Sequence, residues 1–351
     1  MHRDSNTLVI LTPGFPSSEE DTTCLPMQQN FILALKKMNP ALNIIILSFQ
    51  YPYRRSSYQC HGITVISFNG RNKGGLSKLL LRRKINKTLK EIYTSNKLVG
   101  LLSFWYGECA FVGKKFAGKY AIKHYSWILG QDAKQSNKYP KRLKPKAGEL
   151  IALSDFLQDE FEKSHGTRPE YVITPGINTT YFNNEPKEKS IDILGAGSLI
   201  PLKQYDVFIE AVAEIKKKFP CIKAGLIGKG PEKNKLQELI EKLDLQSTIT
   251  MTGELPYPEL LQLMQKTKLF LHPSSYEGFS GVCQEALHAG AQVISFVKPM
   301  NGEIKNWHLA INKEQMIQKM VELLNSPGAY EKTDLFKIED SAKKMMELFY
   351  Q

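Results

Sequence analysis

Two carboxylates in the second half of the chain have a spacing that could serve sugar chemistry. Glu277 and Glu285, with seven residues between them, lie in the segment SSYEGFSGVCQEALHAGAQVIS (274–295). The pattern predicts a loop and then a helix from about Gly281 to Ala289, which the following glycine ends in a left-handed conformation. Unpaired backbone N–H groups at the start of such a helix favour an anion, typically a phosphate. Glycines at this point let the backbone approach a ligand closely.

The two glutamates could therefore hold different parts of one ligand. We expect Glu285, placed in the first helical turn, to accept hydrogen bonds from ribose hydroxyls beside the phosphate. Glu277, on the loop, can reach the hydroxyls of a second sugar. The alternative is that Glu285 only complements the helix dipole, worth about 0.3–1 kcal/mol, and that Glu277 is a solvated loop residue.

Three further stretches leave a strand through glycines and enter a helix. The first contains Lys203, and the last runs into the loop of Glu277. They read GAGSLIPLKQYDVFIEAV (195–212), GLIGKGPEKNKLQEL (225–239) and TMTGELPYPELLQLMQKTKLFLHPSSYEGF (250–279). A single glycine pair of this kind would be a weak signal, but the succession is specific in combination.

This succession resembles glycosyltransferase family 4 of the bacterial type, whose members are retaining enzymes of the GT-B fold that use sugar nucleotides. The resemblance covers nearly all of residues 191–296. It implies that Glu277 binds the transferred sugar, that Glu285 binds the donor's ribose, and that Lys203 neutralises the diphosphate leaving group. It also implies donor contacts through backbone atoms, made by Gly14 after the first strand, by Gly253 and Leu255 in a later turn, and by Gly281 and Val282 at the helix start.

The chain departs from the family pattern at two positions. Ser198 stands where the family usually has an arginine, so half of the usual diphosphate clamp is missing. Leu129 stands where many relatives have a histidine that contacts the sugar, while Asp132 remains. We expect Asp132 to face the sugar or orient the acceptor, or else to cap the following helix. His124, five residues before Leu129, reads as a core histidine within a strand.

The elements that must position these residues indicate an α/β fold. Short apolar strands alternate with helical stretches in both halves, which predicts two doubly wound, Rossmann-like domains with parallel sheets and a ligand cleft between them. We expect a first domain over 1–182, a polar linker at 183–190, a donor-binding domain over 191–330, and a C-terminal helix within 331–351 that returns to the first domain.

Charge is divided unevenly between these halves. Of the net charge of +12, residues 1–190 carry 28 basic against 15 acidic side chains, and residues 191–351 carry 19 against 20. The basic half suggests an anionic partner. The stretch 74–93 places Leu76, Leu80, Ile85, Leu89 and Ile92 near one helical stripe, with the basic residues Lys78, Arg82, Arg83, Lys84, Lys87 and Lys90 around it.

This basic stretch is either a packed surface helix with a solvated face or a helix that lies on an anionic membrane. A second basic run, KQSNKYPKRLKPK (134–146), is either a solvated loop or a holder of phosphates on a lipid-linked acceptor. Nucleic acid is not favoured, because the sequence shows no interleaved aromatic platform. No stretch is long and apolar enough for a signal peptide or membrane span, and the five scattered cysteines fit free thiols, so we expect a cytoplasmic protein.

Together these features predict a retaining glycosyltransferase of the hexosyltransferase type, with a UDP- or GDP-sugar donor and a glycan or lipid-linked acceptor, in surface polysaccharide synthesis. The chain contains no Asp-x-Asp sequence, so we expect no metal cofactor. Two alternatives remain. One is a GT-B epimerase that acts on a nucleotide sugar without an acceptor. The other is a degenerate subunit that binds a sugar nucleotide and transfers nothing.

Overall fold

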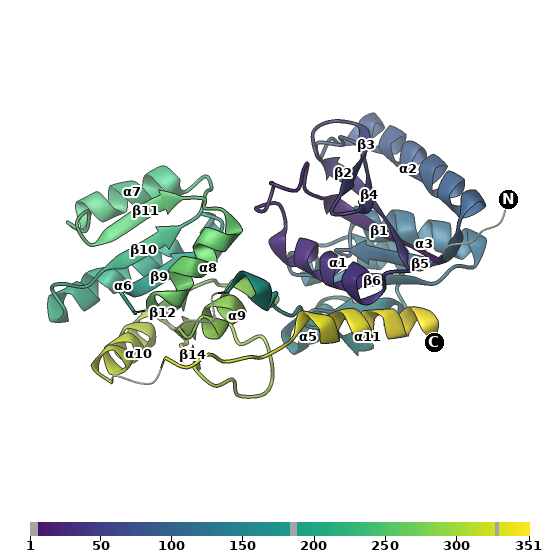
Figure 1. Cartoon of the computed structure of the whole chain (residues 1–351). Helices are drawn as coiled ribbons and strands as arrows, with labels where there is room; N and C mark the ends of the chain where they lie inside the picture. The colour runs from purple at the N-terminus through teal and green to yellow at the C-terminus, as the bar shows by residue number, and fades with distance from the viewer. Residues whose placement is uncertain (1–5, 183–187, 327–329) are drawn as a thin grey trace. The chain divides into compact units, whose positions relative to one another are not determined.

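The structure is a computed structural model that describes residues 6–182, 188–326 and 330–351. The chain divides into two compact units, which Figure 1 shows. Unit 1 comprises residues 1–176 and 336–351, and unit 2 comprises residues 177–335. Most of the polar stretch expected as a linker, residues 183–187, lies outside the described residues. The interdomain cleft that the sequence predicts stays a prediction.

Unit 1 is built on an eight-stranded sheet in the order β3-β4-β2-β1-β5-β6-β7-β8. Its neighbouring strands are parallel, except that β3 runs antiparallel to β4. The strands are β1 (Asn6–Gly14), β2 (Asn43–Tyr51), β3 (Ser56–Cys60), β4 (Ile63–Ser67), β5 (Lys97–Phe104), β6 (His124–Ile128), β7 (Leu150–Ala152) and β8 (Tyr171–Val172).

Helices pack on both faces of this sheet. They are α1 (Pro26–Met38), α2 (Gly75–Ser95), α3 (Glu108–Tyr120), α4 (Tyr139–Leu143), α5 (Asp155–His165) and α11 (Ile338–Tyr350). Residues of α2 and α3 form one hydrophobic cluster with Val9 and Leu11 of β1. On β5 and β6, Phe104 and Trp127 instead contact Phe31 of α1. Alternate side chains of the strands thus serve opposite layers, as expected for a doubly wound sheet.

The helix α11 completes unit 1, although 159 residues of unit 2 precede it in the chain. It packs against α1 and β5. Phe349 lies so close to Gly100 that a Cβ there would fall 2.4 Å from the phenylalanine ring. The Tyr125 hydroxyl donates to the Leu348 carbonyl at 2.9 Å, and the Tyr125 ring meets the Phe349 ring edge-on. The return of this helix to the first sheet agrees with the fold expected from the sequence.

Unit 2 is built on a six-stranded parallel sheet in the order β11-β10-β9-β12-β13-β14. The strands are β9 (Ile191–Ala196), β10 (Ala224–Ile227), β11 (Ile249–Gly253), β12 (Thr267–His272), β13 (Gln292–Ser295) and β14 (Trp307–Leu309). The helices are α6 (Tyr205–Lys218), α7 (Lys233–Lys242), α8 (Tyr257–Gln265), α9 (Gly281–His288) and α10 (Lys313–Asn325). This α/β architecture of two parallel-sheet domains confirms the predicted fold class.

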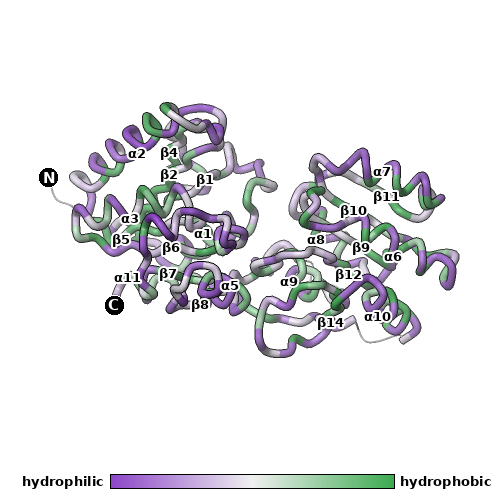
Figure 2. Tube along the Cα trace, turned by 180° about the vertical axis from the view of Figure 1, so that it is seen from behind, coloured by the Kyte–Doolittle hydropathy of each residue, from purple (hydrophilic) through white to green (hydrophobic). Residues whose placement is uncertain are grey.

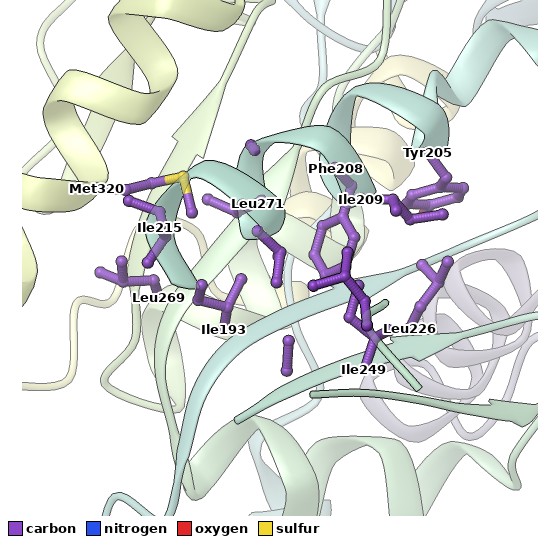
Figure 3. Close-up of a cluster of buried hydrophobic side chains, with 14 of the residues drawn as sticks. Ile193, Tyr205, Phe208, Ile209, Ile215, Leu226, Ile249, Leu269, Leu271 and Met320 are labelled. Atoms are coloured by element: carbon purple, nitrogen blue, oxygen red, sulfur yellow. The ribbon is translucent and has the colours of Figure 1, made fainter. Parts of the chain in front are cut away.

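Two hydrophobic clusters hold the helices of unit 2 to opposite faces of the sheet. One joins α6, α7 and α10 to the strands, and Figure 3 shows Phe208 and Ile209 of α6 above Ile193 of β9 in this cluster. The other joins α8 and α9 to the strands through residues such as Leu261 and Leu287. Burying each large apolar side chain stabilises the fold by about 1.5–3 kcal/mol. This packing fixes the positions of the strands and of the loops at their ends.

The predicted apolar stripe of α2 is partly wrong. Leu81, Ile85, Leu89 and Ile92 are buried, whereas Leu76 and Leu80 are 79% and 52% exposed. At about 100° per residue, Leu76 lies on the opposite side of the helix from Ile85. The start of α2 therefore presents leucines outward instead of packing them, and Figure 2 shows hydrophilic segments along much of the same helix.

Candidate functional site

The carboxyl ends of three neighbouring strands of unit 2, β9, β10 and β11, lead into three glycine turns. Gly197 follows β9, Gly228 follows β10 and Gly253 ends β11, all with positive φ, at 151°, 147° and 79°. The Gly228 N–H donates to the Gly253 carbonyl at 2.9 Å, and a Cβ on Gly228 would lie 1.8 Å from the Gly197 carbonyl oxygen. Only glycine permits this approach of backbones. The repeated glycines of the sequence thus form one tightly packed edge.

Two loops at this edge are tied together by hydrogen bonds to one carbonyl. The Ser275 N–H donates to the Leu202 carbonyl at 3.0 Å, and the Ser274 hydroxyl donates to the same oxygen at 3.2 Å. Leu202 belongs to a 3₁₀ turn, Pro201–Lys203, that precedes α6. These bonds bring Lys203 against the loop that carries Glu277, although the two residues are far apart in sequence.

Glu277 is held as an anion by two partners. Lys203 forms an ion pair with its carboxylate, and the side chains are only 17% and 20% exposed. His272, which ends β12 and is 2% exposed, shares a hydrogen bond of 3.0 Å between its Nε2 and the same carboxylate. Burial raises the pKa of Glu277, but the His272 hydrogen bond and the Lys203 charge outweigh it and lower the pKa to about 2. The solvated-loop interpretation of Glu277 is therefore wrong.

His272 is best described as a neutral hydrogen-bond donor. Burial lowers its pKa, although the hydrogen bond to Glu277 acts in the other direction. A neutral imidazole can donate from Nε2 while Nδ1 carries a lone pair, and Nδ1 has no hydrogen-bond partner among the described residues. The ring thus orients the Glu277 carboxylate without adding a full charge beside Lys203.

Glu285 has a different environment. The helix α9 begins at Gly281, and no acidic residue lies in its first turn. Glu285 is therefore the fifth helical residue, so its expected place in the first turn, and with it the helix-dipole interpretation, is wrong. The Tyr257 hydroxyl of α8 donates to its carboxylate at 2.7 Å. Burial raises the pKa of Glu285 to about 7, against the opposing effect of the Tyr257 hydrogen bond.

The other expected donor-binding residues of unit 2 lie along the same edge. Ser198 is exposed directly after Gly197, and Gly253 and Leu255 are half-buried around the turn after β11. Gly281 and Val282 are half-buried at the start of α9, where the Ser280 hydroxyl caps the helix by accepting from the Cys283 N–H at 3.4 Å. Gly290, with φ at 78°, follows this helix as predicted.

The candidate residues of unit 1 lie at different points of its sheet. Gly14 is the last residue of β1, so it lies at the carboxyl end of its sheet. His124 begins β6, bonds to the Ser103 hydroxyl at 2.9 Å, and has its pKa lowered to about 3 by burial. It lies in a strand as the sequence predicts, but it is half-buried and not a core residue.

Asp132 sits in a 3₁₀ turn, Gln131–Ala133, and organises the loop around it. Its carboxylate accepts from the N–H groups of Tyr106 at 2.7 Å, Gly130 at 2.8 Å and Leu129 at 3.2 Å. Burial raises the pKa of Asp132 to about 6, although these backbone hydrogen bonds act to lower it. The Asp132 carboxylate thus accepts from backbone groups that precede the turn. It does not cap a following helix.

The basic residues of α2 fall into two groups. Lys78 and Arg82 both pair with the Glu108 carboxylate of α3, which the Tyr139 hydroxyl also contacts. Burial raises the pKa of Glu108, but the bonds from Arg82 and Lys78 prevail and lower it to about 2. Arg83 and Lys87 are exposed, as are Lys84 and Lys90. Half of the expected acceptor-side residues thus hold α2 against α3 instead of facing outward.

Sequence reasoning missed three residues that the structure places in these networks, namely His272, Tyr257 and Glu108. His272 could have been found as the last residue of a strand whose carboxyl end carries the site. Tyr257 and Glu108 had no signal, because only packing between helices brings them to their partners.

Comparison with known proteins finds a family and relatives whose sequences are similar to this chain. Residues 177–333 match the family model of Glycosyl transferases group 1. An uncharacterized glycosyltransferase of Methanocaldococcus jannaschii is 28% identical over 264 residues, which cover 72% of this chain and 72% of that protein. The UDP-N-acetylglucosamine–peptide N-acetylglucosaminyltransferase GtfA subunit of Streptococcus parasanguinis is 29% identical over 149 residues, 42% of this chain and 29% of that protein.

Solved structures show the same fold along the whole chain. Sucrose-phosphate synthase from Thermosynechococcus elongatus has a TM-score of 0.76 at 15% identity, over 99% of this chain and 98% of that one. An Anabaena protein crystallised with UDP and glucose has a TM-score of 0.71 at 17% identity, over 98% and 99%. The comparisons thus show similarity to group 1 glycosyltransferases over residues 177–333 and a GT-B fold for the chain.

Proposed function

We propose that the protein is a retaining glycosyltransferase that moves a hexose from a nucleoside-diphosphate sugar to a glycan or lipid-linked acceptor. The observation that carries this proposal is the site at the carboxyl edge of unit 2. An ionised Glu277, oriented by Lys203 and His272, stands a loop and one helix turn before a second half-buried carboxylate, Glu285. The two carboxylates suit a ligand that carries hydroxyls, and the lysine between the loops suits a phosphate on the same ligand.

In this proposal each part of the donor has its own partners. Glu285 accepts hydrogen bonds from the ribose, Lys203 and the N–H groups at the start of α9 face the diphosphate, and Glu277 accepts from hydroxyls of the transferred sugar. The base meets backbone atoms around Gly253 and Leu255. A UDP-sugar is the first donor to test, since the streptococcal relative is named for UDP-N-acetylglucosamine and the Anabaena structure contains UDP.

The reaction would proceed mainly by positioning and electrostatics. The acceptor hydroxyl attacks the anomeric carbon on the face from which the diphosphate departs, and a diphosphate oxygen takes the proton. Lys203 stabilises the charge that develops on the leaving group. We propose no metal in this step and a role in surface polysaccharide synthesis on the cytoplasmic side.

The direct test is to incubate purified protein with UDP- and GDP-sugars, with and without candidate glycan and lipid-linked acceptors, and to follow products by mass spectrometry. We expect nucleoside diphosphate release that depends on an acceptor, with the anomeric configuration retained. Isomerised nucleotide sugar without acceptor would identify an epimerase. Tight binding with no product for any acceptor would identify a binding subunit, the alternative that the exposed Ser198 favours.

Affinity for the nucleoside diphosphate should depend on the protonation of Glu285. Because its pKa is about 7, the carboxylate is mostly ionised at pH 8 and mostly protonated at pH 6. The ionised form accepts hydrogen bonds from both ribose hydroxyls, so affinity for UDP should fall roughly tenfold as the pH decreases across this interval. Calorimetric titration at several pH values measures the effect.

Glu285→Gln is the control, because it removes this protonation step while the phosphate of UDP still titrates. The variant should bind UDP weakly at both pH values. An unchanged pH dependence in the variant would assign the effect to the ligand and contradict the role of Glu285.

We propose in addition that α2 contacts an anionic membrane. Its first turns expose Leu76, Leu79 and Leu80, at 79%, 44% and 52%. Four exposed basic residues follow them in the next turns, namely Arg83, Lys84, Lys87 and Lys90. Apolar side chains beside basic ones suit the interface of an anionic bilayer. No helix in the described part of the chain combines the length and apolarity needed to cross a bilayer.

Replacing these four basic residues with glutamine should abolish co-sedimentation with anionic liposomes. Each contributes about 1 kcal/mol near an anionic surface, so the loss is about a thousandfold in partitioning. Lys78 and Arg82 stay unchanged, because they hold Glu108. The control replaces four exposed lysines of unit 2, Lys217, Lys218, Lys233 and Lys242, by glutamine. Equal loss in the control, or no binding of the wild type at low salt, would contradict the membrane proposal.

A further inference from the structure

The turn after β9 lacks a cation of its own where a diphosphate would need one. Ser198 is exposed at this turn, directly after Gly197. Lys203 lies at the end of the same loop and forms an ion pair with Glu277. A single lysine would then have to serve both a carboxylate and a ligand that carries at least two negative charges.

A second lysine stands next to this turn, in the turn that follows the neighbouring strand β10. Lys229 follows β10, and its carbonyl accepts from the Leu199 N–H at 2.9 Å, so its backbone lies beside residue 198. The packing of Gly228 on Gly197 fixes the two turns at this separation. β10 is the direct neighbour of β9, whereas Lys298 follows β13, which β12 separates from β9.

Lys229 also has a partner that it can exchange. Its ammonium group forms an ion pair with Glu254, and the two side chains are 70% and 35% exposed. Such solvent-exposed pairs contribute little to stability. A diphosphate offers more charge and several acceptor oxygens, so it competes well for an ammonium group held in this way. Glu254 directly follows Gly253, so the pair stands at the turn assigned to the nucleoside.

We propose that Lys229 supplies the second cation of the diphosphate site, from the turn after β10, in place of an arginine at position 198. In the ligand-free protein the two lysines of the edge are each paired with a glutamate, Lys203 with Glu277 and Lys229 with Glu254. When the donor binds, both lysines turn to the diphosphate, and the Glu277 carboxylate becomes available to the sugar. This inference rests on the proposed donor site.

The experiment compares a nucleoside diphosphate with the nucleoside that lacks the diphosphate. UDP and GDP are titrated calorimetrically into wild-type protein, and the one that binds is used with its nucleoside. Lys229→Gln should weaken binding of the nucleoside diphosphate about tenfold and leave binding of the nucleoside unchanged. The matched control is Lys217→Gln. Lys217 is 68% exposed and paired with Glu214. It lies near the end of α6, away from the carboxyl ends of the strands.

A rescue variant separates a ligand contact from a structural role. In the Lys229→Gln background, Ser198→Arg should restore most of the lost affinity, because it returns a cation to the same place from the adjacent turn. Equal affinity of wild type and Lys229→Gln for the diphosphate would overturn the inference while leaving the donor site intact. Equal losses for diphosphate and nucleoside, or no rescue, would also overturn it. Failure of the wild type to bind either diphosphate would instead contradict the proposed function.

Discussion

Replacing Glu277 with glutamine should lower turnover about a hundredfold or more, and should leave the affinity for the free nucleoside diphosphate almost unchanged. In our proposal this carboxylate contacts only the transferred sugar, and misplacement of a reacting group by about 1 Å already costs about a hundredfold. The loss of its charge also frees Lys203, so affinity for UDP should stay constant or rise slightly. Steady-state kinetics and calorimetric titration measure the two quantities.

Glu285→Gln is the matched control for this prediction, since it removes the other half-buried carboxylate of the site. It should show the reverse pattern, with weak binding of the nucleoside diphosphate at every pH. If both variants lose affinity for UDP or GDP to the same extent, the two glutamates do not serve different parts of one donor, and the proposed division of roles is wrong.

Replacing Lys203 with alanine should lower kcat/KM roughly ten- to a hundredfold. A charge-assisted hydrogen bond to the leaving diphosphate is worth about 1.5–3 kcal/mol, and no metal shares this role in our proposal. Activity of the wild type should therefore survive EDTA. Arginine at this position should retain part of the activity, because it keeps the charge.

The control for Lys203 is Lys268→Ala. Lys268 is also a partly buried lysine of unit 2, and it pairs with Asp192, with an Nζ to carboxylate distance of 2.7 Å. Lys268 lies near the start of β12, away from the carboxyl edge, so its loss should change stability but not kcat/KM. Complete loss of wild-type activity in EDTA would show that a metal stabilises the leaving group, and would contradict the assignment to Lys203.

The fold was predictable because the strongest local signals coincide with the buried strands. Apolar runs such as TLVILT and LNIIILSF became β1 and β2, and glycines placed directly after strands became tight turns. Two strands, β3 and β14, do not coincide with such apolar runs. The first, SSYQC, is polar and partly exposed, and the second has only three residues, so neither carries an apolar signal.

The candidate site was predictable in its members but not in their contacts. The spacing of Glu277 and Glu285 is visible in the sequence, whereas the pairing of Glu277 with Lys203 depends on two serines that bind one carbonyl. The environment of Glu285 depends on Tyr257 from a different helix. Such contacts arise from tertiary packing, and no local pattern encodes them. The exposed leucines of α2 were misassigned for a different reason, because the predicted stripe did not keep the helical period, which places Leu76 opposite Ile85.

The return of α11 to unit 1 has a consequence for how the protein is made. Synthesis runs from the N-terminus, and domains generally fold as units while the chain emerges. The sheet of unit 1 is complete by β8, yet the helix that covers Gly100 and Tyr125 follows all of unit 2. Unit 2 can therefore fold on the ribosome while unit 1 still exposes the apolar surface that Phe349 later buries. The first unit to begin folding is the last to finish.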